Sequence, residues 1–277
     1  MILAGCDIGS LTAKAVVMEE ERILGTAVIR ANIRPAESAD NVMKLALEKA
    51  GLAMNDISYV VGTGYGKEQV SFVDSVASEI SCHAKGAIHV QPSARMVIDI
   101  GGQDSKATRM DKNGKVERYL YNDKCASGTG RFLEVMAQSL KIPLEDLGDV
   151  AAKSKEKLTI SNQCVIFAET EVVSLVNEGK ETCDIMKALH FALAKRVAAM
   201  AKSIEIKEDV VMTGGVAKNM GVFGAMSKVL NIELKPLNGV DPQISGALGA
   251  ALYAKEKVNN GAEIKKSCPN KNLDTEI

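Results

Sequence analysis

The sequence contains no tryptophan, few aromatic residues and no long apolar segment. Phe and Tyr together make up only 4% of the 277 residues. The most apolar helical stretch, residues 185–201, is interrupted by three basic residues and His190, so that it falls short of the roughly 18 apolar residues of a membrane span. A strand-like segment follows the first methionine, where a basic leader with a cleavage site is lacking. These absences predict a cytoplasmic protein that does not span a membrane.

Neither sign of charge dominates, and no disulfide pattern is visible. The 34 Lys and Arg residues balance 35 Asp and Glu residues, which argues against a surface that coats nucleic acid. The six cysteines are scattered and form no CxxC pair, so that a disulfide framework is not expected. The length fits a globular protein of two domains.

The chain contains an internal repeat. Residues 7–18 align with residues 99–110 at a constant offset, and six of the twelve positions are identical. Each copy predicts a buried strand, a turn at Asp-Ile-Gly, a second strand, a polar turn and a third strand. The repeat therefore predicts a duplicated two-lobed α/β protein. Its lobes are residues 1–94, completed by a helix over 245–257, and residues 95–244, followed by a polar tail over 258–277.

The remaining elements alternate between helices and buried strands. Periodic apolar residues and helix-ending glycines predict helices over 36–50, 129–140, 165–178, 182–203 and 245–255, and strands over 57–61 and 209–212. Cys82, His83 and His89 fall in a segment with mixed character, which we interpret as a loop in which these side chains pack. Cys6, Cys183 and His190 are expected to be structural, and Cys268 lies in the tail.

Two Asp-x-Gly turns that face each other across a cleft are suited to hold phosphate groups. Glycine lets backbone N–H groups approach an anion, and hydroxyl and ammonium groups add donors. Carboxylates bind Mg²⁺, often through water, and a polar side chain beside the transferred phosphate orients the attacking water. The predicted phosphate ligands are Gly9, Ser10, Thr12, Lys14, Gly101 and Gly102; the Mg²⁺ ligands are Asp7 and Asp99; and the residues that orient water are Gln103 and Asp104.

A third glycine turn follows the strand over 209–212 and includes Gly214, Gly215 and Asn219. Flat ligands stack on such a turn, so that it is a candidate for the adenosine, although an ordinary strand-to-helix connection has the same pattern. The loop of Gly62, Gly64 and Gly66 around Tyr65 is interpreted as structural unless the nucleotide reaches it.

These turns together resemble the nucleotide-binding fold of actin, hexokinase and Hsp70 over residues 2–254. Three segments, 99–104, 122–136 and 164–173, resemble more closely the activator component of 2-hydroxyacyl-CoA dehydratases. That family includes ATP-binding subunits of benzoyl-CoA reductase and reductases of double-cubane iron-sulfur proteins.

The resemblance implies a homodimer that binds ATP, ADP and Mg²⁺ and holds one 4Fe-4S cluster between its subunits. By motif, Cys125 and Cys164 of each subunit are the cluster ligands. The resemblance also implies that ATP hydrolysis drives one low-potential electron from a ferredoxin or flavodoxin donor into a dehydratase or reductase partner, in an anaerobic host. Both cysteines precede predicted helices, and a helix N-terminus favours the thiolate form.

Two other functions remain open at this point. A small-molecule kinase of the same fold would phosphorylate a sugar or a carboxylate, but no segment is large enough for an elaborate substrate lobe. An actin-like ATP-binding module without a cluster is the other alternative.

Overall fold

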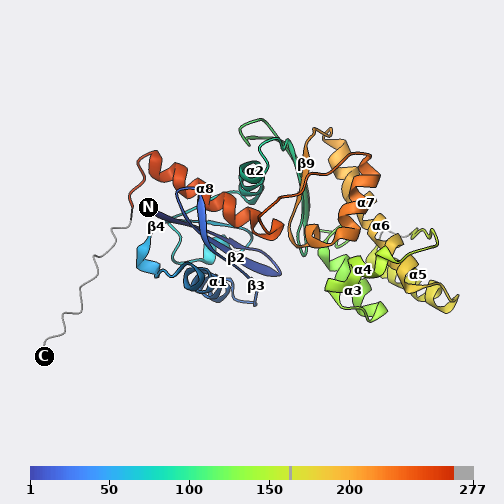
Figure 1. Ribbon diagram of the computed structural model, residues 1–277. Helices are drawn as coiled ribbons and strands as arrows, with labels where there is room; N and C mark the ends of the chain where they lie inside the picture. Colours follow the sequence, from blue (N-terminus) through green and yellow to red (C-terminus); the bar gives the residue numbers. More distant parts are fainter. Residues whose placement is uncertain (162–163, 265–277) are drawn as a thin grey trace, which may run out of the picture.

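The computed structural model describes residues 1–161 and 164–264. The chain forms two lobes, each built on one mixed β-sheet (Figure 1). The sheet of the first lobe has the strand order β3-β2-β1-β4-β5. Its strands are β1 (Ile2–Ile8), β2 (Thr12–Glu19), β3 (Arg22–Arg30), β4 (Ile57–Thr63) and β5 (Ser75–Val76), and its helices are α1 (Pro35–Ala50) and α2 (Glu79–Val90).

The second lobe has the strand order β8-β7-β6-β9 and carries most of the helices. Its strands are β6 (Met96–Ile100), β7 (Ser105–Met110), β8 (Val116–Asn122) and β9 (Val210–Thr213). Its helices are α3 (Gly130–Leu140), α4 (Leu147–Ala152), α5 (Val165–Asn177), α6 (Thr182–Ser203) and α7 (Met220–Leu230).

The internal repeat is present as two hairpins of identical register. In the first, β1 pairs antiparallel with β2 so that Asp7 lies opposite Lys14. In the second, β6 pairs with β7 so that Asp99 lies opposite Lys106. A parallel strand then extends each sheet on the other side of the first strand, β4 beside β1 and β9 beside β6. The duplicated α/β fold predicted from the sequence is confirmed.

The last helix, α8 (Ser245–Asn259), returns to the first lobe and packs against β1, β4 and α2. Small residues allow this close packing. A Cβ atom on Gly5 would lie 2.0 Å from the carbonyl oxygen of Ala247, and one on Gly249 would lie 1.8 Å from that of Cys82. The lobe boundaries near residues 94 and 244 stay a prediction.

One predicted loop is a helix. Cys82, His83 and His89 all lie on α2, where β-branched residues, His and Gly86 give a weak local helix signal. The helix is stabilised by packing against α8, where a Cβ on Gly86 would lie 2.1 Å from the carbonyl oxygen of Ser245. The interpretation of this segment as a loop is therefore wrong, because tertiary packing outweighs local propensity.

The burial of the remaining cysteines agrees in part with the sequence prediction. Cys6 is fully buried in β1, whereas Cys183, in the first turn of α6, is only half-buried. Cys268 and residues 265–277 of the predicted tail lie outside the described residues. Within the described ranges, none of the helices has the length and apolar character needed to cross a membrane.

Candidate functional site

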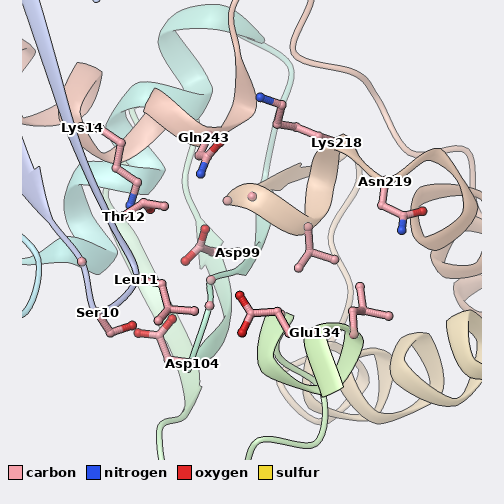
Figure 2. Close-up of a pocket in the computed structure, with 18 of the residues that line it drawn as sticks. Ser10, Leu11, Thr12, Lys14, Asp99, Asp104, Glu134, Lys218, Asn219 and Gln243 are labelled. Atoms are coloured by element: carbon pink, nitrogen blue, oxygen red, sulfur yellow. The ribbon is translucent and has the colours of Figure 1, made fainter. Parts of the chain in front are cut away.

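A cavity of about 500 Å³ lies between the two lobes, and both Asp-x-Gly turns face it (Figure 2). Most of the site residues predicted from the sequence line this cavity. They are Gly9, Ser10, Thr12, Lys14, Asp99, Gly101, Gly102, Asp104, Gly214, Gly215 and Asn219. Of the residues predicted to bind the nucleotide and Mg²⁺ or to orient water, two do not line it: Asp7 lies behind Lys14, and Gln103 is exposed to solvent. The geometry therefore favours Asp104 over Gln103 as the side chain beside a bound phosphate.

The first turn is closed by a hydrogen bond from the backbone N–H of Gly9 to the carbonyl oxygen of Thr12 (3.0 Å). Behind it, the ammonium of Lys14 lies 3.1 Å from the carboxylate of Asp7, which is only 1% exposed. Burial lowers the pKa of Lys14, but Asp7 outweighs this and raises it, so that Lys14 stays charged. A cationic donor therefore faces the cavity from the first lobe.

The loop after β4 belongs to the site, beyond the structural role assigned to it from the sequence. Gly64 has φ of +85°, and a Cβ atom there would lie 2.5 Å from Oδ1 of Asp7. Only glycine is compatible with both this backbone conformation and this approach. The next residue, Tyr65, lines the cavity.

The second turn is closed in the same way, from the N–H of Gly101 to the carbonyl oxygen of Asp104 (3.0 Å). Its aspartate has more partners than that of the first turn. The hydroxyl of Thr213 donates to Oδ1 of Asp99 (2.8 Å), and Nδ1 of His83 lies 3.3 Å from the same oxygen. The second carboxylate is thus fixed by groups from β9 and α2.

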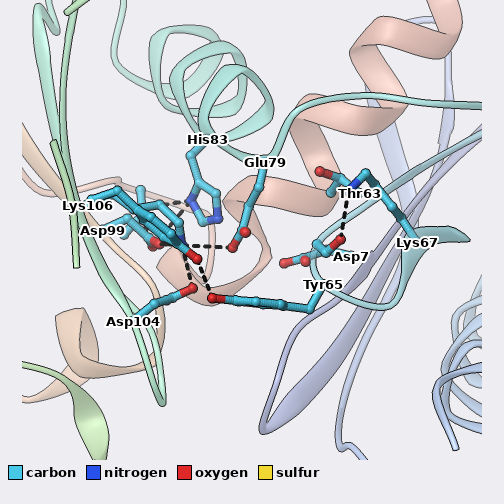
Figure 3. Close-up of polar contacts among 12 residues, drawn as sticks. Asp7, Thr63, Tyr65, Lys67, Glu79, His83, Asp99, Asp104 and Lys106 are labelled. Carbon is cyan, nitrogen blue, oxygen red and sulfur yellow. Dashed lines mark hydrogen bonds and ion pairs between the residues drawn. The ribbon is translucent and has the colours of Figure 1, made fainter. Parts of the chain in front are cut away.

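Lys106 is the centre of a buried charge cluster beneath the second turn (Figure 3). Its ammonium lies 2.9 Å from Asp104, 2.9 Å from Glu79 and 3.2 Å from Asp99, and its side chain is 1% exposed. Burial opposes the charge, but these three carboxylates outweigh it and raise the pKa of Lys106. The lysine therefore acts as a permanent internal counterion.

The carboxylates around Lys106 differ in acidity. Burial would raise the pKa of Asp99, but His83, Lys106 and the Thr213 hydrogen bond hold it below its usual range. Burial does raise the pKa of Asp104 and of Glu79, since Lys106 offsets it only in part. Asp99 is thus suited to remain an anion, and Asp104 is suited to accept a proton at the edge of the cavity.

The oxygen ligands fit a hard cation such as Mg²⁺ at the first turn. Apart from the ion pair with Lys14, the buried carboxylate of Asp7 accepts no hydrogen bond from the described chain, so that it retains lone pairs for a hydrated ion. Glu79, His83 and Asp99 bring three ligand atoms within 4.8 Å of one another. The ammonium of Lys106 lies within 3.2 Å of both carboxylates of this group and offsets part of their charge, so that the cluster has a cation without a metal ion.

The third turn begins at Gly214, whose φ is +83°. A Cβ atom there would lie 2.4 Å from the carbonyl oxygen of Ile100, so that glycine is required. Asn219 ends the turn, but its amide is already bonded: Oδ1 accepts from the N–H groups of Gly221 and Val222, and Nδ2 lies 3.2 Å from Nε2 of His190. Asn219 thus shapes this wall and caps α7, while His190 supports it from the core.

Both predicted cluster ligands are exposed cysteines outside the cavity. Cys164 is the residue at the N-cap of α5. Cys125 precedes the first residue of α3, Gly130, by five positions, and Thr129 occupies the N-cap. Both thiols therefore lie near the start of a helix, as expected: Cys164 is at the N-cap itself, and Cys125 lies in the loop just before the N-cap of α3. That loop is held by a hydrogen bond from Asn122 to the carbonyl oxygen of Cys125 (2.8 Å).

The sequence interpretation missed four residues of the site: the half-buried Glu79 and the buried His83, Lys106 and Thr213. A signal existed for Lys106, because the repeat aligns it with Lys14. No local signal marks Glu79 or His83, since the contacts of Glu79 with Lys106 and of His83 with Asp99 depend on how α2 packs beside the second hairpin.

Solved structures of low sequence identity have the same fold. A ROK family glucokinase from Streptomyces griseus superposes with a TM-score of 0.58 at 16% identity, over 92% of this chain and 100% of that chain. This likeness concerns the fold alone, and it confirms the hexokinase-like architecture predicted from the sequence.

Closer relatives resemble the chain over nearly its whole length. An activator of lactoyl-CoA dehydratase from Anaerotignum propionicum is 43% identical over 260 residues, 92% of this chain and 98% of the relative. The structure of an activator of 2-hydroxyisocaproyl-CoA dehydratase from Clostridium difficile with bound ADPNP is 40% identical, with a TM-score of 0.89 over 96% of this chain and 100% of that one. Residues 4–254 match one family model, and the chain accordingly belongs to the BadF/BadG/BcrA/BcrD ATPase family.

Proposed function

We propose that the protein is an ATP-hydrolysing activator that transfers a single low-potential electron to a dehydratase or reductase of the 2-hydroxyacyl-CoA dehydratase type. A structural relative with a TM-score of 0.89 is an activator with bound ADPNP, and this chain has a cavity of about 500 Å³ between its two lobes. ATP and Mg²⁺ are proposed to bind there, with Lys14 on the phosphates, Asp7 and Asp99 on the hydrated ion, and Asp104 beside the attacking water. Gln103 is the less favoured candidate for that last role because it is exposed.

The observation that carries this proposal is a continuous set of contacts from the second phosphate turn to both cysteine segments. The first N–H groups of α3 donate to the turn: Gly130 to the carbonyl oxygen of Gly101 (2.8 Å) and Arg131 to that of Gly102 (2.7 Å). Ser139, at the other end of α3, donates to Glu169 of α5 (2.6 Å). Movement of the turn on hydrolysis would therefore displace α3, which follows Cys125, and α5, which begins after Cys164.

The residues near the cysteines fit a group shared by two copies of the chain. A 4Fe-4S cluster takes four thiolates, so that Cys125 and Cys164 of one subunit supply half of them. Beside Cys164, α5 exposes apolar side chains, with Ile166 70% and Phe167 62% exposed and Val173 and Val176 also exposed. Such a face is suited to burial against a second subunit. When bound, the cluster would supply the one-electron chemistry.

Iron and acid-labile sulfide per polypeptide, measured on anaerobically purified protein together with its native mass, test this proposal. We expect about two iron and two sulfide per chain in a dimer, since one cluster would be shared. Cys125→Ala and Cys164→Ala should each lose the iron, whereas Cys183→Ala, a half-buried cysteine of α6, should retain it. An iron-free protein after anaerobic reconstitution would contradict the proposal and favour an ATPase or kinase without a cluster.

The electron acceptor and the ferredoxin or flavodoxin donor are the partners proposed for this function. The anaerobic host and the cytoplasmic location stay predictions from the sequence.

A further inference from the structure

Two tyrosines connect the lobes at the mouth of the cavity. Tyr65 lies on the loop after β4 in the first lobe, and Tyr121 lies on β8 in the second. Their hydroxyl groups are hydrogen-bonded to each other. Tyr65 is 53% exposed and lines the cavity, and it reaches toward the charge cluster of the second turn (Figure 3). A nucleotide that enters or leaves the cavity therefore passes beside this contact.

The ring of Tyr121 also lies over the ammonium of Lys106. The distance from Nζ to the ring centroid is 5.3 Å, within the range of a cation–π contact. Burial and the hydrogen bond to Tyr65 raise the pKa of Tyr121, so that its hydroxyl stays protonated at neutral pH. One side chain of the second lobe thus contacts both Tyr65 and the counterion of the second turn.

Lys106 in turn fixes the carboxylate that faces the cavity. It lies 2.9 Å from Oδ2 of Asp104 and 2.9 Å from Oε1 of Glu79. The other oxygen of Asp104, Oδ1, lies against the phosphate turn, only 2.4 Å from where a Cβ on Gly101 would stand. A shift of Lys106 would therefore reorient Asp104 where the attacking water is proposed to stand.

We propose that Tyr65 and Tyr121 form a latch that couples closure of the cleft to the position of Lys106 and Asp104. Closure brings Tyr65 against Tyr121, and Tyr121 holds Lys106 in place. Opening breaks the contact and loosens the residues that orient water. Both tyrosines are positioning residues that act on hydrolysis through Lys106. This inference rests on the proposed hydrolysis of ATP in the cleft.

Phenylalanine variants test the latch because they remove one hydroxyl and keep the ring. Tyr65→Phe, Tyr121→Phe and the double variant are compared with Tyr119→Phe, a control on the same strand that is 55% exposed. Stopped-flow release of the fluorescent nucleotide mant-ADP is the measurement. We expect each single variant to release mant-ADP about 2- to 10-fold faster, because each loses one hydrogen bond. The double variant should release it no faster than the singles, and the control should match the wild type.

Tyr121→Leu separates the two contacts of Tyr121. It removes the ring over Lys106 as well as the hydroxyl, so that kcat for ATP hydrolysis should fall below that of Tyr121→Phe while mant-ADP release is the same in both. Wild-type release in the single variants, additive effects in the double variant, or equal kcat in the two Tyr121 variants would each overturn the latch. A wild-type protein that binds no mant-ADP would instead remove the proposed function, and the latch with it.

Discussion

The two Asp–Lys pairs occupy equivalent places in the two lobes but have different surroundings. Asp7 and Lys14 are 3.1 Å apart, and Asp99 and Lys106 are 3.2 Å apart, each pair in the same hairpin register. Lys14 contacts one carboxylate and lines the cavity. Lys106 contacts three carboxylates, and it is not among the described residues that line the cavity.

The same difference extends to the strand beside each hairpin. Thr63 pairs with Asp7 across β4, as Thr213 pairs with Asp99 across β9, and each threonine is followed by a glycine with positive φ. The hydroxyl of Thr63 donates to the carbonyl oxygen of Ala77 (3.0 Å), whereas that of Thr213 donates to Asp99. The duplicated unit has thus diverged: the first hairpin keeps its charges available to a ligand, and the second uses them to fix a carboxylate.

Removal of the two lysines tests this divergence, and Lys106→Met should have the larger effect on stability. It leaves three carboxylates without their buried counterion, which costs about 3–5 kcal/mol when one partner of a buried pair is removed. Urea unfolding at neutral pH measures the loss. Part of it should be regained in mild acid, because Asp104 and Glu79, whose pKa values burial already raises, can then take up protons. Lys14→Met leaves only one carboxylate unpaired, so that it should lower the free energy of unfolding less. An equal loss of stability in the two variants would contradict the proposed divergence of the two Asp–Lys pairs.

Acid should weaken the support of the third turn, which depends on His190. Burial lowers the pKa of His190 to about 4, below the value of roughly 6.5 in the unfolded chain. The unfolded state therefore takes up the proton first, and stability is lost as the pH falls from about 6.5 to about 4, by about 3 kcal/mol in total. His190→Gln should remove that portion of the pH dependence in urea unfolding. A variant whose stability falls as steeply as that of the wild type over this range would exclude a neutral buried His190.

The sequence predicts the parts of the site that belong to the internal repeat. It misses the side chains that other helices and strands contribute. Each Asp-x-Gly turn is specified by a few consecutive residues, so that alignment of the two copies is enough to place the turns, Asp99 and Lys14. The partners of Asp99 come from α2 and β9. Local sequence patterns do not predict that these two elements meet at Asp99. The position of His83 depends on the packing of α2 against α8, where glycines allow close approach, and that of Thr213 depends on the pairing of β9 with β6.

Two further details of the site are left open by the sequence, because local position does not determine side-chain direction. Gln103 and Asp104 are adjacent on the turn, and the sequence gives no means of ranking them. The structure buries Asp104 against Lys106 and exposes Gln103. Similarly, Cys125 and Cys164 both precede a helix in the sequence, but only Cys164 occupies an N-cap. The backbone conformation of each turn determines which side chain is buried and where each helix begins.

Lys14→Met should primarily affect ligand binding. A hydrogen bond to a charged group contributes about 1.5–3 kcal/mol, so that the affinity for ATP should fall roughly 10- to 100-fold. Equilibrium titration with ATP in the presence of Mg²⁺ measures this change, and Lys218→Met is a useful control, because Lys218 also lines the cavity but pairs with Asp241 (2.9 Å). Should the two variants bind ATP equally well, the assignment of Lys14 to the phosphates would be incorrect.

The smallest expected effect comes from the matched pair of threonines. Thr63 and Thr213 are both fully buried, and valine preserves their shape while it removes the hydroxyl. A hydrogen bond to a neutral carbonyl contributes about 0.5–1.5 kcal/mol, and one to a carboxylate about 1.5–3 kcal/mol. Thr213→Val should therefore lower the free energy of unfolding by roughly 1 kcal/mol more than Thr63→Val does. His83 limits this difference, since its Nδ1 lies 3.3 Å from Asp99 and can donate in place of the lost hydroxyl. Equal losses in the two valine variants would show that His83 compensates fully, and that the second hairpin does not depend on Thr213 to fix its carboxylate.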